Sequence, residues 1–458
     1  MSETFRTEHD TMGPVRVPAE ALYGAQTQRA VENFPISRMR FGRGFLSALG
    51  LVKFAAAQAN QQTGTLPSPI ANAIETAAQE VMDGRHDSQF VVDVFQTGSG
   101  TSTNMNANEV IAARATTLHG KPIHPNDHVN RSQSSNDVFP TALHIAAART
   151  AQETLLPAID ALRQTLEAKR KQFWEILKIG RTHLQDAVPM RLGQEFGGYA
   201  RQVELSQARI RKALEDLYEL PLGGTAVGSG INAAPGFAKT AIAIIAERTG
   251  LPFREAQNHF ETQAARDGAV FLSGALKTYA IALTKIANDI RWLGSGPRCG
   301  LGELQLPEVQ PGSSIMPGKV NPVIAESVLM VCAQVIGHDA TISWGAGSGA
   351  LELNTMMPLI AYDLLESIEL LAAASRNFEE RCITGLEANE VRLRDTLERS
   401  LALATALTPE IGYERAASLA HAAYDSGRTI RKTAEEQSGI APERLAELLD
   451  PTKMVGPA

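Results

Sequence analysis

The 458-residue sequence has few aromatic residues and very few cysteines. Aromatic side chains make up 5% of the chain while 44% of its residues are hydrophobic, so aliphatic residues and alanine must fill most of the core. That composition favours closely packed helices over an aromatic-rich β-sandwich. Cys299, Cys332 and Cys382 are widely spaced and odd in number, which fits neither a disulfide framework nor a CxxC metal site. We therefore expect an all-α protein of a reducing compartment.

The sequence also lacks an excess of positive charge and a long apolar run. With 43 lysines and arginines against 50 acidic residues, the net charge of −7 gives no electrostatic reason to expect nucleic acid or an anionic membrane as a partner. No stretch of about 18 uninterrupted apolar residues occurs, and the charged start MSETFRTEHD has neither the apolar segment of a signal peptide nor the acid-poor composition of a mitochondrial leader. We expect a soluble, unexported, cytoplasmic protein.

Several common functional motifs are missing. The glycine patterns of dinucleotide and P-loop sites, the H-E-x-x-H zinc motif and the G-x-S-x-G elbow of serine hydrolases do not occur. His124 and His128 are the closest histidines, but a third ligand with suitable spacing is absent and Pro125 interrupts any helix between them. We therefore expect no metal and no cofactor.

Apolar residues at helical spacing fill the middle of the chain. One example is the series Leu155, Ile159, Leu162 and Leu166, whose spacings of four, three and four place it on one helix face. Five such stretches could pack as an extended bundle: 155–166, 199–217, 272–290, 323–342 and 355–378.

The ends of the chain differ from this middle part. The first 130 or so residues mix short helical runs with turns, and the last 68 or so are charged and amphipathic. The length also exceeds that of one ordinary domain. We expect three domains: a mixed, mainly helical domain at 1–133, a five-helix bundle at 134–390 and a small helical domain at 391–458.

Glycine-rich breaks separate the helical stretches, at 96–103, 223–230, 294–302, 311–318 and 345–349. Any one of them could be an ordinary helix-capping loop, because glycine is common at helix C-termini. Their number favours a second interpretation, in which rigid helices position loops whose main-chain N–H groups hold anions.

The segment from Gly312 to Pro322 is the most specific of these loops. It places two hydroxyls, Ser313 and Ser314, close to Lys319 and Asn321, both of which can donate hydrogen bonds to a carboxylate. Its glycines permit unusual backbone angles, while its prolines fix the approach of the chain. The loop therefore predicts an anion-binding catalytic site.

This segment resembles the signature of the fumarase/aspartase superfamily, which also includes argininosuccinate and adenylosuccinate lyases. The resemblance covers nearly the whole chain, and further matching segments lie at 11–13, 22–27, 96–101, 104–106, 124–127, 132–137 and 180–186. It implies three mostly helical domains, the central one a long five-helix bundle, and a homotetramer with a twenty-helix core. It also implies active sites that each draw residues from three subunits.

The resemblance assigns the proton-transfer chemistry to the glycine-rich loop. Ser313 matches the catalytic base, which removes a proton beside a carboxylate and must be activated as an alkoxide by Lys319 and main-chain N–H groups. The resulting carbanion is drawn into that carboxylate. Lys319 and Asn321 match the groups that clamp it, with Ser314 and Val320 nearby, and Glu326 matches a carboxylate that pairs with the lysine.

Other matching segments supply the remaining contacts. His183, which by itself could simply cap a helix, matches the histidine that acts with a bound water at the leaving hydroxyl, and Thr182 matches a substrate contact. A second dicarboxylate site outside the catalytic pocket is implied at His124, Pro125, Asn126 and Asp127, although Lys121 stands where arginine is frequent and the preceding loop is short. Neutral groups that match the substrate-carboxylate loops are Ser99, Gly100, Thr101, Ser134, Ser135 and Asn136.

The implied reaction is the reversible, metal-independent anti addition of water to fumarate, giving (S)-malate. The alternative is an aspartate ammonia-lyase, which shares the serine loop but expels ammonia. Ser135 favours water because aspartases usually have threonine there, whereas 186–190 resembles aspartase more closely. A crystallin-like structural role is a third possibility, but Ser313, Lys319, Asn321 and His183 are all retained.

Overall fold

The computed structural model describes residues 4–456, so the first three residues of the charged start lie outside it. The chain is 63% helical with little strand, which confirms the all-α expectation. The helices are α1 (Ala25–Asn33), α2 (Arg43–Gln62), α3 (Ser68–Met82), α4 (Thr101–His119), α5 (Ser135–Thr150), α6 (Leu156–Gln172), α7 (Leu192–Leu217), α8 (Phe237–Thr249), α9 (His259–Ala264), α10 (Asp267–Leu293), α11 (Val323–Gly347), α12 (Met357–Phe378), α13 (Glu390–Arg399), α14 (Thr408–Ile411), α15 (Tyr413–Ser426), α16 (Ile430–Gln437) and α17 (Pro442–Leu448).

Within residues 4–456, the strands form four two-stranded pairs. They are β1 (Phe5–Asp10) with β2 (Gly13–Pro18), β3 (Leu177–Thr182) with β4 (Gln185–Arg191), β5 (Glu219–Leu220) with β6 (Arg254–Glu255), and β7 (Leu304–Gln305) with β8 (Glu387–Ala388). Only the β5–β6 pair is parallel.

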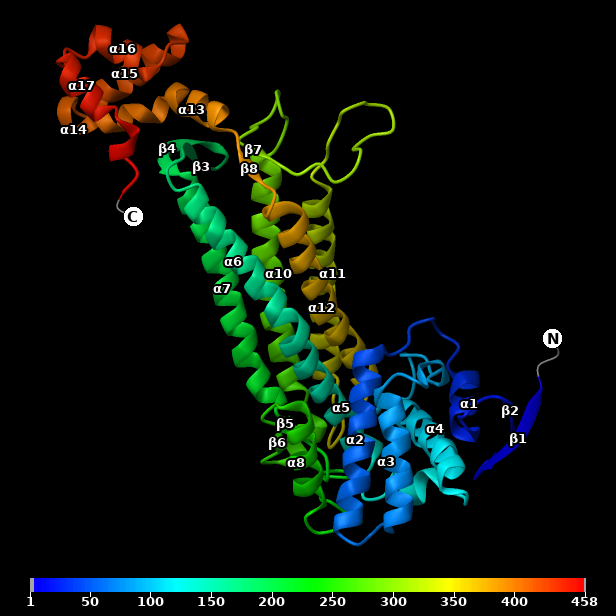
Figure 1. Cartoon of the computed structure of the whole chain (residues 1–458). Helices are drawn as coiled ribbons and strands as arrows, with labels where there is room; N and C mark the ends of the chain where they lie inside the picture. Colours follow the sequence, from blue (N-terminus) through cyan, green and yellow to red (C-terminus); the bar gives the residue numbers. More distant parts are fainter. Residues whose placement is uncertain (1–3, 457–458) are drawn as a thin grey trace. The chain divides into compact units, whose positions relative to one another are not determined.

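The five predicted helical stretches correspond to the long helices α6, α7, α10, α11 and α12, drawn from teal to orange in Figure 1. The predicted stripe residues are buried; on α10, for example, Leu272, Leu276, Tyr279, Leu283 and Ile286 are fully inaccessible. The helices α6, α7 and α10 therefore bury the faces that their apolar spacing predicted.

The chain divides into two compact units. Unit 1 comprises 1–157, 206–280 and 331–373, and unit 2 comprises 158–205, 281–330 and 374–458. The division falls inside all five long helices, so it does not test the domain boundaries near 133 and 390, which stay a prediction.

Unit 1 contains longer N-terminal helices than the sequence indicated. Instead of short helical runs, α2 has 20 residues and α4 has 19. Most of α4 is buried, including Asn104, Asn106 and Asn108, so polar and apolar residues do not alternate with helical period. In Figure 1, α2 and α3 lie side by side, and a Cβ at Gly50 of α2 would stand 3.1 Å from the Ala78 carbonyl oxygen of α3.

Unit 2 contains the β3–β4 hairpin, the β7–β8 pair and the C-terminal helices. The C-terminal helices share an apolar cluster of their own, which includes Leu403, Leu407, Leu419, Ile430 and Leu445. This confirms the helical character predicted for the last 68 residues (Figure 1, orange to red).

Two helices are long and apolar enough to cross a membrane by length and composition, although neither contains an uninterrupted apolar run. They are α10 and α11. In the most apolar 18-residue stretch of each helix, 56% of the residues are buried for α10 and 33% for α11. Large apolar side chains remain exposed on both helices, among them Phe271, Ile281, Trp292, Met330 and Trp344. Core helices of soluble proteins pass the same test, so length and composition alone do not identify a membrane span. Exposed apolar residues that lie together commonly mark an interaction surface.

Candidate active site

The first predicted carboxylate loop lies at the N-terminus of α4. Gly100 is the N-cap and has a φ of 74°, and a Cβ there would stand 2.1 Å from the Phe139 ring. A Cβ at Gly98 would stand 1.8 Å from the Thr355 carbonyl oxygen. Both glycines are therefore required by close packing. The loop leaves main-chain N–H groups at a helix N-terminus, where an anion is stabilised.

Ser134 begins the second carboxylate loop as the N-cap of α5. It forms a capping box with Asp137, whose Oδ1 accepts the Ser134 N–H at 2.9 Å. The other carboxylate oxygen of Asp137 accepts the N–H groups of Gly223 and Thr225, at 3.0 and 2.9 Å. One buried carboxylate thus joins the predicted loop to the glycine-rich segment at 223–230.

The next two residues are held by amide contacts. Ser135 Oγ accepts a hydrogen bond from Asn104 Nδ2 at 2.9 Å, and Asn136 Nδ2 donates to the Ala226 carbonyl at 2.8 Å. These contacts fix both side chains before any substrate arrives, as a preorganised site requires.

A buried lysine supports this loop from within unit 1. Lys53 Nζ donates to Asn130 Oδ1 at 3.1 Å and to Gln133 Oε1 at 2.9 Å. Burial lowers the pKa of Lys53 to about 7, against the opposing charge of Asp137, and burial raises the pKa of Asp137 to about 6 in spite of its main-chain hydrogen bonds. Lys53 was not predicted from the sequence.

A cavity of about 430 Å³ brings the two loops together. Thr101 from the first loop and residues 134–136 from the second line it, with Thr225 and Asn232 on its other wall. Thr225 and Asn232 have φ values of 53° and 65°, which are rare for residues other than glycine and accumulate at functional sites. The sequence pointed to this wall only through the glycines at 223–230.

In unit 2, the predicted catalytic loop closes on itself between β7 and α11. The Gly312 N–H donates to the Lys319 carbonyl at 2.8 Å, and Asn321 Nδ2 donates to the Gly312 carbonyl at 2.6 Å. A Cβ at Gly312 would stand 2.4 Å from the Lys319 carbonyl oxygen, so the closure requires glycine.

Ser313 is held by main-chain donors. Its Oγ accepts the N–H of Ile315 at 3.2 Å and of Met316 at 3.0 Å. Two N–H groups directed at a hydroxyl oxygen stabilise negative charge on it, so this geometry favours the alkoxide form. The loop therefore directs main-chain N–H groups at this oxygen, and the role of Ser313 as a base stays a prediction.

The middle of this loop, residues 314–320, is open to solvent. Ser314, Lys319 and Val320 are exposed, and Glu326 is half-buried in the first turn of α11. Among the ion pairs of residues 4–456, none joins Lys319 to Glu326, so the pairing implied by the resemblance stays a prediction. The exposed Lys319 side chain remains available for an anion.

Thr182 and His183 lie at the tip of the β3–β4 hairpin, and not at a helix cap. Thr182 pairs with Gln185, which leaves His183 and Leu184 as a two-residue turn with φ values of 57° and 58°. Two positive φ angles define the type I′ turn that matches strand twist, normally occupied by asparagine and glycine. The strain of placing histidine there indicates a functional position.

Buried charges hold the base of this hairpin. Lys178 Nζ lies 2.8 Å from Glu195 Oε2 and 3.1 Å from Glu303 Oε2, and an Arg181 guanidinium nitrogen lies 2.6 Å from Glu303 Oε1. Glu303 is inaccessible, and its oxygens attract these cations without aligned hydrogen bonds. Two cations on one buried carboxylate make the base rigid, while the tip stays exposed.

Comparison with known proteins identifies the family. A family model described as lyase matches residues 13–337, and one described as fumarase C C-terminus matches residues 403–456. The class II fumarate hydratase of Mycobacterium tuberculosis is 56% identical over 97% of this chain and 94% of its own length. The chain belongs to the class II fumarate hydratase family. The class II fumarate hydratase of Ralstonia nicotianae is 52% identical over 99% of this chain and 100% of its own length.

Solved structures agree with the class II fumarate hydratase fold. The class II fumarase from Schistosoma mansoni superposes with a TM-score of 0.96 at 40% identity, covering 98% of this chain and 99% of that chain. A fumarate lyase:delta crystallin from Brucella melitensis bound to cobalt gives 0.95 at 47% identity, covering 99% and 100%. The predicted all-α fold of the fumarase/aspartase type is thereby confirmed.

The second dicarboxylate site implied for class II fumarate hydratases falls on a surface turn of unit 1. His124 precedes a π-helical turn, Pro125–Val129, and its Nδ1 accepts the N–H groups of Asn126 and Asp127 at 3.2 and 3.1 Å. The His124 N–H donates to His128 Nδ1 at 2.8 Å. The four predicted residues therefore lie together, and their binding role stays a prediction.

Proposed function

We propose that the protein is a fumarate hydratase, which reversibly adds water to fumarate and gives (S)-malate. Class II fumarate hydratases more than half identical over nearly the whole chain support this activity. The observation that carries the chemistry is the Ser313 hydroxyl oxygen, which accepts two main-chain N–H groups in the same loop as Lys319 and Asn321. The required reaction is proton removal beside a carboxylate, followed by loss of hydroxide as water.

In the direction from malate, Ser313 takes the proton next to a carboxylate. The alkoxide is a strong base, and the N–H groups of Ile315 and Met316 make its formation less costly. The electron pair left on carbon moves into the carboxylate, which then carries an extra negative charge. We assign Lys319 and Asn321 to that charge, with Ser314 and Val320 beside them and Glu326 orienting the lysine.

The carboxylates of the substrate bind to neutral groups. The cavity of unit 1 presents hydroxyls of Thr101, Ser134 and Ser135 and the amide of Asn136, with Ser99 and Gly100 at the adjoining turn. Hydroxyls, amides and the N-termini of α4 and α5 stabilise a dianion without a permanent opposing charge, so the product can leave.

Departure of the hydroxyl group needs a proton. We assign it to His183, acting with a water molecule at the exposed tip of the hairpin, and Thr182 to a substrate contact. This sequence of steps requires neither a metal ion nor a cofactor.

The test of this function is an absorbance assay of the fumarate double bond. With malate as substrate we expect rapid formation of fumarate, and with aspartate we expect none. The Ser313→Ala variant gives the background rate. Rapid formation from aspartate and none from malate would establish an ammonia-lyase instead, and no reaction with either would overturn both activities.

We also propose a homotetramer with a twenty-helix core, in which each active site draws residues from three subunits, in the cytoplasm. The exposed apolar residues of α10 and α11 support this assembly, since an apolar surface of that kind is covered in stable oligomers. Two of the predicted site regions, 99–101 and 134–136, lie in unit 1. The other two, 182–183 and 313–321, lie in unit 2, and each unit is compact by itself.

Mixing two inactive variants tests the shared site. Ser313→Ala chains and Ser135→Ala chains are denatured together and refolded, with each variant refolded alone as control. Each of the two regions is unmutated in half of the mixed chains. If separate chains supply the two regions, about one site in four therefore has both regions intact. Recovery of no activity in mixed tetramers of the correct mass would show that one chain supplies both regions.

A further inference from the structure

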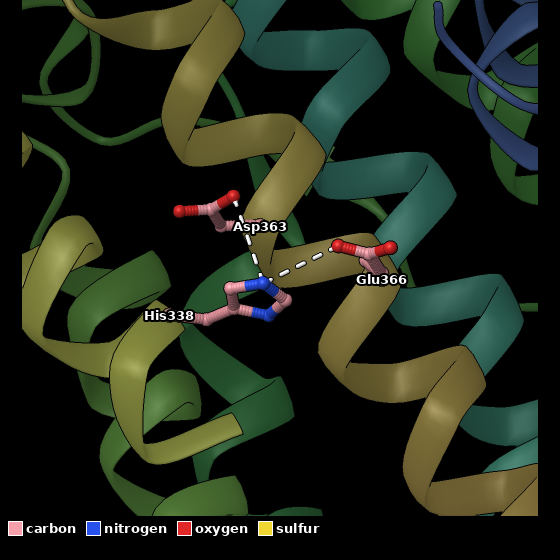
Figure 2. Close-up of side chains that lie close together, drawn as sticks. All are labelled: His338, Asp363 and Glu366. Atoms are coloured by element: carbon pink, nitrogen blue, oxygen red, sulfur yellow. Dashed lines mark ion pairs between the residues drawn. The ribbon is translucent and has the colours of Figure 1, made fainter. Parts of the chain in front are cut away.

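A histidine and two carboxylates, none of them among the residues assigned to the fumarate reaction, meet between α11 and α12 in unit 1. His338 Nε2 lies 3.3 Å from Glu366 Oε2 and 4.0 Å from Asp363 Oδ1. Figure 2 shows the imidazole directed between the two carboxylates, which come from one turn of α12. One ligand atom from each of the three residues lies within 4.8 Å of the other two.

The tautomer of His338 follows from its other nitrogen. Ser367 Oγ donates its only hydrogen to the Asp363 carbonyl at 2.7 Å, so at 2.9 Å from His338 Nδ1 it acts as an acceptor. Nδ1 therefore carries a proton, and in the neutral imidazole Nε2 then holds the lone pair on the side of the carboxylates. A histidine fixed in this way by a partner on its far nitrogen is oriented as a metal ligand.

One neighbour is within hydrogen-bond distance of that nitrogen. The Gln334 Nε2 amide lies 2.7 Å from His338 Nε2. Gln334 is exposed on α11, so its side chain can turn away or present its amide oxygen as a further ligand. Nothing in the backbone has to move to free the imidazole nitrogen.

Negative charge accumulates around this point without a balancing cation. Burial, and then the charge of Glu366, raises the pKa of Asp363 to about 6, and the same two causes raise the pKa of Glu369. Within residues 4–456, no lysine or arginine pairs with Asp363, Glu366 or Glu369. The other polar groups that interact with the cluster are the Gln334 amide and the hydroxyls of Ser367, Thr341 and Tyr362. The hydroxyls and the amide carry no charge.

We propose that His338, Asp363 and Glu366 bind a divalent first-row transition metal ion, with Zn²⁺ and Co²⁺ as the best-matched probes. A tetrahedral ion with bonds of about 2.1 Å needs ligand atoms about 3.4 Å apart, so small side-chain rotations suffice. One imidazole with two carboxylates suits these ions better than Mg²⁺ or Ca²⁺, which prefer oxygen ligands alone. The ion would tie α11 to α12, and Glu366, whose side chain is 38% exposed, gives it access from solvent.

Metal titration of the untagged, chelator-treated full-length protein tests the site. Co²⁺ added to the intact oligomer should produce the visible absorption of a low-coordinate cobalt centre, saturate at one ion per chain and raise the melting temperature. Zn²⁺ should displace the cobalt and abolish that absorption. None of these readouts depends on catalysis.

Three variants and a control decide the outcome. His338→Asn, Asp363→Asn and Glu366→Gln should each weaken binding at least tenfold, whereas His421→Asn, which removes an exposed histidine of α15, should leave it unchanged. Circular dichroism and oligomer mass establish that each variant is folded, and Glu366→Gln, at a partly exposed position, is the variant most certain to fold. Sub-stoichiometric binding, or binding that survives in all three variants, would overturn the proposal.

Discussion

Replacing Ser313 with alanine should lower kcat for malate dehydration by about 10³-fold, the middle of the range for loss of a general base. The variant removes only the oxygen that accepts the N–H groups of Ile315 and Met316. Because Gly312 is held by Lys319 and Asn321, the loop keeps its closure without the hydroxyl. The oligomeric mass and melting temperature should therefore match the parent, and steady-state kinetics give the loss.

A matched control is Ser418→Ala, the same chemical change at an exposed serine of α15 whose hydroxyl donates to the Glu414 carbonyl. Its kcat should equal that of the parent. Ser314→Ala, next to the proposed base, should reduce activity much less than Ser313→Ala. If Ser313→Ala retains near-normal kcat, another group removes the proton and the role of Ser313 is wrong.

Replacing Lys319 with methionine should lower kcat by about 10²- to 10³-fold, the usual cost of removing one group that stabilises developing charge. The charge on the reacting carboxylate grows as the proton leaves, so the ammonium group stabilises the transition state more than bound malate. Methionine preserves most of the side chain while removing its charge. Measurement of kcat and KM with malate separates the two effects, and Lys319→Arg should recover part of kcat.

Lys432→Met provides the control, since it removes an exposed lysine from α16. It should leave kcat and KM unchanged. A Lys319→Met enzyme in which KM rises while kcat stays within about twofold of the parent would contradict the proposal, because Lys319 would then bind substrate and transition state equally.

Helices with one buried face could be predicted from the sequence, whereas helices buried on most sides could not. Leu155 to Leu166 and the stripes at 199–217 and 272–290 have apolar residues at helical spacing, and α6, α7 and α10 follow them. In α4, buried asparagines alternate with buried apolar residues. The asparagines can be buried because their amides form hydrogen bonds to other segments. Polarity then no longer reports burial, and the periodic pattern disappears.

The loops that we propose as catalytic could be read from the sequence where their polar residues are close together in the chain. Ser313 with Lys319 and Asn321, and Ser134 with its two neighbours, are such segments. Lys53 and Thr225 belong to the same surroundings only through the fold, since Lys53 contacts residues about 80 positions away and Thr225 contacts Asp137. The His338 cluster is of the same kind, because an acidic pair three residues apart on a helix usually marks a solvated face.

The two-residue turn at His183 and Leu184 limits how this part of the chain can change over evolution. A longer surface loop accepts inserted or deleted residues, but here a single insertion would convert the hairpin to another turn class and rotate the imidazole away from its present direction. Chemistry at the tip can therefore vary by exchanging the side chain at position 183 and not by altering the length of the chain. In related enzymes that catalyse a different elimination, this hairpin should differ in residue identity while keeping the same number of residues between its strands.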